Sequence, residues 1–137
     1  MPLKLEDDHY CFACGSENPG GLHLVFESGG RGVRVFFTPE RRHQGYKGVV
    51  HGGIISTILD EAMAHAAIRA GHWPVTAEIT VRFKSAIPVG QKVVAEGWIE
   101  EGPDNRKRRL LEAASELKTY PEGALVAAAR AKLMRPE

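Results

Sequence analysis

The chain has 137 residues, 43% of them hydrophobic, which is enough for one domain with a real core. Its 18 basic and 17 acidic residues nearly balance, which argues against nucleic acid as a partner. No apolar run reaches the ~20 residues of a membrane span, and Met1 to Asp8 lacks an apolar signal region, so we expect a cytoplasmic protein.

We treat residues 1–137 as a single domain in which residues 1–21 form an irregular lead-in. Two strands are expected next, because Leu22, Leu24 and Phe26 alternate with polar residues and a second alternation follows over 33–37. A break at 28–30 separates them, and 38–50 is expected to be loop.

One helix is expected from Gly52 to about Ala70, ended by Gly71. Apolar residues cover most of its circumference, which is typical of a buried helix. Its polar residues form a narrow stripe with i+4 spacing, in which Glu61 is expected to pair with His65 or Arg69.

Four further strands are expected over 77–84, 93–101, 107–119 and 124–134, because the pattern changes to period two after Pro74. Turns are expected at 87–90 and 102–105. The order predicts an α+β fold, with one long helix against a curved antiparallel sheet of about six strands. A single helix leaves part of such a sheet uncovered and its edge unpaired, so we expect a homodimer or a dimer of dimers.

The run His51-Gly52-Gly53, followed by Asp60, carries the chemistry of the chain. Glycines at a helix start either allow close helix packing or let a ligand approach bare backbone, and we favour the second. Unpaired N–H groups there would stabilise a carbonyl oxygen that becomes negative. A carboxylate on a largely apolar helix is costly to bury, which favours a functional role for Asp60 over a place on a solvated face.

These residues resemble the hotdog-fold acyl-CoA thioesterases, in particular the PaaI-like branch. The segments His43–Val50 and Cys11–Leu22 share the resemblance, which covers roughly 10–134. It implies that the Gly53 N–H polarises a thioester carbonyl, that Asp60 is nucleophile or general base, and that the site lies between subunits. It implies no metal or redox cofactor.

Several residues are further candidates for contact with acyl-CoA. His51 is expected either to bind substrate or to fix its loop by a hydrogen bond. The other candidates are Gly52, Gln44, Glu61, His65, Arg82 and Lys84. The basic run 106–109, or Arg82 and Lys84, would attract the CoA phosphates; the alternative is a solvated strand end.

Two positions depart from the family pattern. Gly45 stands where many relatives carry Asn or Gln, and Ala64 stands where many carry Ser or Thr. Both changes leave Asp60 with fewer polar neighbours. An acyl-CoA-binding protein without catalysis therefore stays as the alternative, ahead of a hotdog dehydratase or a purely structural dimer.

Cys11 and Cys14 have the spacing of metal ligands or of a redox pair. His9 and His23 are the nearby residues that would complete a zinc site. We favour reduced cysteines in a folded turn and expect no metal.

Overall fold

The structure is a computed structural model that describes residues 5–100 and 109–135. Its elements follow in the order β1 (Glu27–Gly29), β2 (Gly32–Phe37), the 3₁₀ turn η1 (Arg41–His43), α1 (Gly52–Arg69), β3 (Val75–Phe83), β4 (Val93–Ile99), β5 (Leu110–Thr119) and β6 (Leu125–Met134). The predicted α+β architecture, with one long helix and six antiparallel strands, is confirmed.

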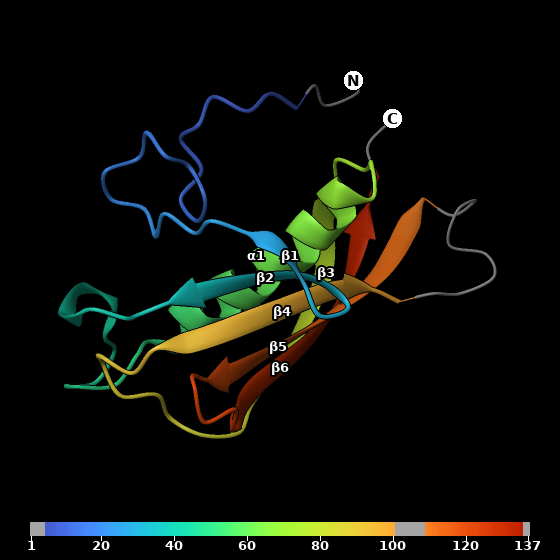
Figure 1. The fold of residues 1–137 in the computed structure, drawn as a ribbon. Coiled ribbons are helices and arrows are strands. Elements are labelled where there is room, and N and C mark those ends of the chain that lie inside the picture. Colours follow the sequence, from blue (N-terminus) through green and yellow to red (C-terminus); the bar gives the residue numbers. More distant parts are fainter. Residues whose placement is uncertain (1–4, 101–108, 136–137) are drawn as a thin grey trace.

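The strands form one antiparallel sheet in the order β1-β2-β4-β5-β6-β3 (Figure 1). Helix α1 lies against one face of this curved sheet and packs on β2, β3, β4, β5 and β6. Small residues let the helix approach closely: a Cβ on Gly97 of β4 would collide with the backbone carbonyl of Ala62. Ser115 of β5 fixes the same region, because its hydroxyl donates to the Leu59 carbonyl at 3.0 Å.

Both ends of α1 are explained by local chemistry. His51 is the N-cap, and its Nδ1 accepts a hydrogen bond from the Gly53 N–H. At the other end Gly71 takes a positive φ of 91°. The Gly71 N–H then donates to the Ile68 carbonyl and the His72 N–H to the Ala67 carbonyl, which is a Schellman motif. The predicted helix and its glycine stop are confirmed.

The first strand differs from the prediction. β1 covers only Glu27–Gly29, and the turn that follows it lies at 30–31. Leu22 and Leu24 are buried as their alternation suggested. Their N–H groups, however, donate to the Phe12 and Ala13 carbonyls at 2.9 Å each. The lead-in thus takes the place of a sheet neighbour, and the two leucines pack the core without belonging to the sheet.

The remaining differences concern boundaries. The loop expected over 38–50 contains η1, where the His43 N–H donates to the Glu40 carbonyl at 2.9 Å. β3 begins at Val75, two residues before the predicted start, and β4 ends at Ile99. β5 begins at Leu110 within the described residues. The turn expected at 102–105 and the basic residues 106–108 lie outside them.

Candidate active site

The start of α1 is open to solvent on two sides. His51, Gly52 and Gly53 are all exposed. A hollow of about 350 Å³ on one side is lined by Phe12, Arg42, His43, Gln44, His51, Gly53, Ile54 and Thr57. A hollow of about 490 Å³ on the other side is lined by Gly45, Tyr46, Val49, Val50, His51 and Gly52. The structure therefore brings together four of the predicted site residues, Gln44, His51, Gly52 and Gly53.

The glycines keep this helix start free of side chains. A Cβ on Gly52 would meet the Phe83 ring of β3 at 3.6 Å, and a Cβ on Gly53 would lie 3.0 Å from His51 Nδ1. A Cβ on Gly45 would lie 3.4 Å from the His51 ring. The departure at Gly45 thus leaves open space beside His51, since a side chain there would cover the imidazole.

His51 performs the loop-fixing role that was one of its two expected roles. Its Nδ1 accepts from the Gly53 N–H at 2.8 Å, which places the proton of a neutral imidazole on Nε2. The N–H that the sequence assigned to a substrate carbonyl is therefore bonded to His51 in this structure. Within the described residues the Gly52 N–H has no hydrogen-bond acceptor.

Gln44 shapes the loop in front of the helix. Its Oε1 accepts from the Gly48 N–H at 3.1 Å, which closes the turn that carries Tyr46. The neighbouring His43 is 5% exposed; its Nδ1 accepts from the Glu40 N–H, and its Nε2 has no partner. Burial lowers the pKa of His43, with the nearby Arg42 charge acting in the same direction.

Asp60 lies further along α1 and is half-buried. Its Oδ1 accepts a hydrogen bond of 2.7 Å from the Thr76 hydroxyl at the start of β3. Burial raises the pKa of Asp60, the Thr76 hydrogen bond opposes this rise, and the Glu61 charge adds to it. The expectation that Ala64 leaves Asp60 short of polar neighbours is corrected, because a strand supplies the hydroxyl that the helix lacks.

Glu61 and His65 lie further along α1 than the two hollows at its start. The predicted i+4 pair forms, with His65 Nε2 at 3.3 Å from Glu61 Oε2. The His65 ring stacks on Phe26, with 4.2 Å between ring centroids. Neither residue lines a hollow at the helix start. Arg69, the other predicted partner of Glu61, donates instead to the Ser28 hydroxyl.

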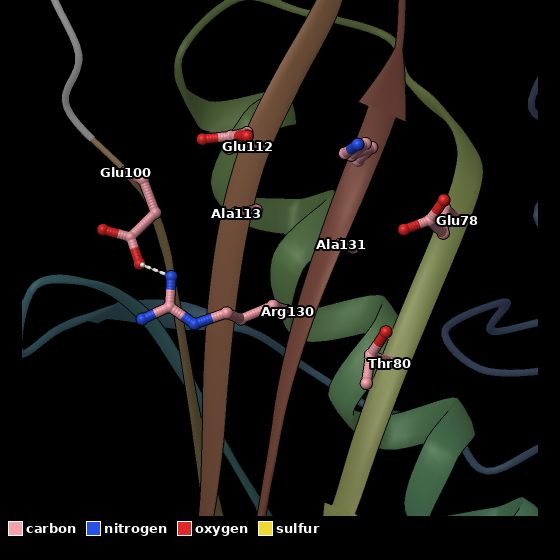
Figure 2. Close-up of a pocket in the computed structure, with 8 residues that line it drawn as sticks. Glu78, Thr80, Glu100, Glu112, Ala113, Arg130 and Ala131 are labelled. Carbon is pink, nitrogen blue, oxygen red and sulfur yellow. Dashed lines mark hydrogen bonds and ion pairs between the residues drawn. The ribbon is translucent and has the colours of Figure 1, made fainter.

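Arg82 and Lys84 line neither hollow at the helix start. Figure 2 shows a third hollow, of about 170 Å³, on the sheet face opposite α1, where Arg130 and Glu100 form an ion pair of 3.1 Å. Glu78 and Thr80 of β3 line it, and alternation along the strand gives Arg82 the same side. Lys84 follows β3 and is exposed. Contact of these two residues with CoA phosphates stays a prediction.

The cysteine pair lies against Glu61 of α1 instead of beside His9 or His23. The sulfur atoms of Cys11 and Cys14 and a carboxylate oxygen of Glu61 lie within 4.8 Å of one another. Both His9 and His23, the ligands expected from the sequence, are exposed and point elsewhere: His9 Nδ1 lies 3.7 Å from Asp7, and His23 Nε2 contacts the Asn18 carbonyl. Burial, and next the Glu61 charge, raise the pKa of Cys14.

Comparison with known proteins gives consistent relatives. Residues 47–102 match the family model of the thioesterase superfamily. Over 70 residues the chain is 31% identical to the acyl-coenzyme A thioesterase THEM5 of Mus musculus, a match that covers 51% of this chain. It covers only 28% of the mouse protein, so the chain spans well under two thirds of that relative's length.

Solved structures agree on the fold. A protein described as a member of the thioesterase superfamily matches with a TM-score of 0.80 at 24% identity, over 92% of this chain and 63% of that one. The PaaI protein of E. coli, from the phenylacetic acid degradation operon, matches with a TM-score of 0.73 at 21% identity, over 83% of this chain and 84% of that one. At these identities the likeness establishes the fold alone.

None of the helices within 5–100 and 109–135 has the length and apolarity needed to cross a bilayer.

Proposed function

We propose that the chain is an acyl-CoA thioesterase, which hydrolyses a thioester to a carboxylic acid and free CoA, because residues 47–102 match the thioesterase superfamily model and the fold is that of solved thioesterase-superfamily proteins. The observation that carries the proposal is the half-buried Asp60, whose carboxylate accepts a hydrogen bond from Thr76 of β3. Asp60 belongs to α1, the helix whose glycine start opens onto two hollows. The mouse relative, an acyl-coenzyme A thioesterase, supports the choice of acyl-CoA as substrate.

One chain cannot bring these parts together. Seven residues separate Gly53 from Asp60, and a helix rises 1.5 Å per residue, so the two lie about 10 Å apart along the axis. A nucleophile must approach to about 3–3.5 Å of the carbonyl carbon. A carbonyl held at the Gly53 N–H is therefore out of reach of Asp60 in the same chain, and a second copy must supply one of the two groups.

The edge strand β3 is suited to bring in that copy. It is nine residues long, ends the sheet, and exposes Ile79 and Phe83 at 37% and 51%. If two β3 strands pair antiparallel about Ile79, residue 76 lies opposite residue 82, and residue 75 opposite residue 83. Thr76 holds Asp60, and the Phe83 ring lies beside Gly52. Asp60 then faces Gly52 and Gly53 of the partner subunit, and we propose a homodimer built in this way.

In this arrangement the thioester carbonyl replaces His51 Nδ1 as the acceptor of the Gly53 N–H, with the free Gly52 N–H beside it. The Asp60 carboxylate of the other subunit then acts in one of two ways. It attacks the carbonyl carbon, expels CoA as a thiolate and leaves an anhydride that water hydrolyses; or it takes a proton from water, whose hydroxide attacks. In both cases the C–S bond breaks, and the CoA thiolate takes up a proton.

One observation favours the alternative, an acyl-CoA-binding protein without turnover. The Gly53 N–H is already satisfied by His51, so polarising a carbonyl there costs one hydrogen bond. Binding in the hollows requires no such exchange. The two functions differ in whether free thiol appears.

A thiol-release assay over short, medium, long and aryl acyl-CoAs tests the proposal. We expect hydrolysis by the wild type and its loss in Asp60→Asn. Glu112→Gln on the outer sheet face is the matched control, because it makes the same acid-to-amide change on the central strand β5, away from the proposed β3 interface. Tight acyl-CoA binding without thiol release by the wild type would favour the binding protein. Equal rates for Asp60→Asn and the wild type would refute the role of Asp60.

A further inference from the structure

The lead-in turn that contains Cys11 and Cys14 is built on the middle of α1. Its two sulfur atoms and the Glu61 carboxylate meet within 4.8 Å, although about 50 residues of sequence separate the cysteines from the carboxylate. All three residues are partly buried. Sulfur and carboxylate oxygen are both ligands of zinc and of similar divalent cations.

The backbone of the turn is fixed independently of the side chains. The Gly15 N–H donates to the Cys11 carbonyl at 2.9 Å, and a Cβ on Gly15 would collide with the Cys11 nitrogen. The Leu22 N–H holds the Phe12 carbonyl from the other side. The Cys14 N–H donates to Cys11 Sγ at 3.5 Å. The fold therefore presents two thiols on a rigid turn.

Glu61 is oriented from its own side. His65 Nε2 lies 3.3 Å from its Oε2, and the His65 ring is held by stacking on Phe26. Within the described part of the chain no lysine or arginine forms an ion pair with Glu61. A carboxylate with 20% of its side chain exposed thus faces two thiols without a permanent cation beside it.

We propose that Cys11, Cys14 and Glu61 form a binding site for a thiophilic divalent cation of the zinc class, with solvent in the remaining coordination position. Ligand atoms around a tetrahedral zinc lie about 3.5–4 Å apart, so small side-chain rotations close the observed cluster around an ion. Binding displaces the thiol protons to solvent. His65 acts as a positioning residue that holds the carboxylate.

Such an ion would tie the lead-in to the helix. Phe12 lies between the two cysteines in sequence and lines the hollow at Gly53. The proposed site therefore fixes one wall of the hollow beside Gly53. It stands independently of the proposed thioesterase activity, because neither Gly53 nor Asp60 is a ligand.

Cobalt(II) titration of the full chain, reduced and stripped of metal by a chelator, tests the site. Thiolate-to-cobalt charge-transfer absorption should appear and saturate at one equivalent, and zinc should abolish it. Cys11→Ser and Cys14→Ser should lose the band. Glu61→Gln should bind cobalt about 10-fold or more weakly. His9→Asn, which removes the nearest histidine in sequence and suits the positive φ there, should titrate like the wild type.

The outcomes separate clearly even if a cysteine variant does not fold. The cobalt affinities of the wild type and of Glu61→Gln then test the site, because glutamine has the same shape as glutamate. Melting curves confirm that both proteins are folded. No thiolate band in the wild type, or cobalt bound without one, would overturn the site. Unchanged affinity in Glu61→Gln, or a loss in His9→Asn, would overturn the ligand set.

Discussion

The hydrogen bond from the Thr76 hydroxyl offers a direct test of the proposed role of Asp60. The bond to Oδ1 is 2.7 Å long, in the range of strong bonds to charged acceptors. Such bonds contribute about 1.5–3 kcal/mol. If the bond holds the carboxylate in its reactive position, Thr76→Val lowers kcat by roughly 10- to 150-fold, at about 1.4 kcal/mol for each factor of ten. The assay is thiol release under saturating acyl-CoA.

Two further variants separate positioning from folding. Valine has the shape of threonine and favours strands, so Thr76→Val should remain folded, with the free energy of unfolding lowered by about 1.5–3 kcal/mol for the lost hydrogen bond. Thr76→Ser, which keeps the hydroxyl, should retain most of the activity. In an Asp60→Asn background, Thr76→Val should lower kcat little further, because both changes disrupt the same hydrogen-bonded carboxylate. A folded Thr76→Val with the wild-type kcat would refute this reasoning.

Three other predictions concern packing, pH and assembly. Gly97→Ala should lower the free energy of unfolding in denaturant by about 1–3 kcal/mol, because its Cβ would collide with the backbone of Ala62; unchanged stability would contradict the close helix packing. Burial lowers the folded-state pKa of His43 below 6.5, so the unfolded chain binds its proton more tightly and stability should be complete above pH 6.5 and fall as the pH drops below it. His43→Asn should flatten this fall, and an equally steep fall in the variant would assign it to other groups. Ile79→Lys on the β3 edge should give a folded monomer in light scattering that does not hydrolyse acyl-CoA, whereas an active monomer would exclude the two-chain site.

The sequence was informative wherever a local pattern determined the structure. Helix α1 was predictable because its apolar run is long and its ends carry specific signals, His51 with two glycines at the start and Gly71 at the end. Strand positions followed from period-two alternation. The alternation of Leu22 and Leu24 led to the wrong prediction of a strand there, because burial beside the lead-in produces the same sequence pattern as burial in a sheet.

The contacts that complete the Asp60 site and the cysteine site could not be predicted from local sequence patterns, because they join segments far apart in the chain. Thr76 reaches Asp60 across 16 residues, and only the path of the chain after Gly71 brings them together. Residue 64 of the helix is an alanine without a hydroxyl, and β3 supplies the hydroxyl that Asp60 accepts from. In the same way, the cysteines suggested a search for nearby histidines, whereas their neighbour is Glu61 on a distant helix.

The central claim, that Gly53 of one chain and Asp60 of another form one catalytic site, is tested most directly by subunit complementation. Asp60→Asn and Gly53→Pro, which removes the N–H within the first turn of α1, should each be inactive as pure dimers. Unfolding, mixing and refolding them at equal amounts should restore about one quarter of wild-type activity, since half the dimers are hybrids with one intact site of two. If refolded mixed dimers hydrolyse acyl-CoA no faster than the separate variants, the two-chain site is contradicted.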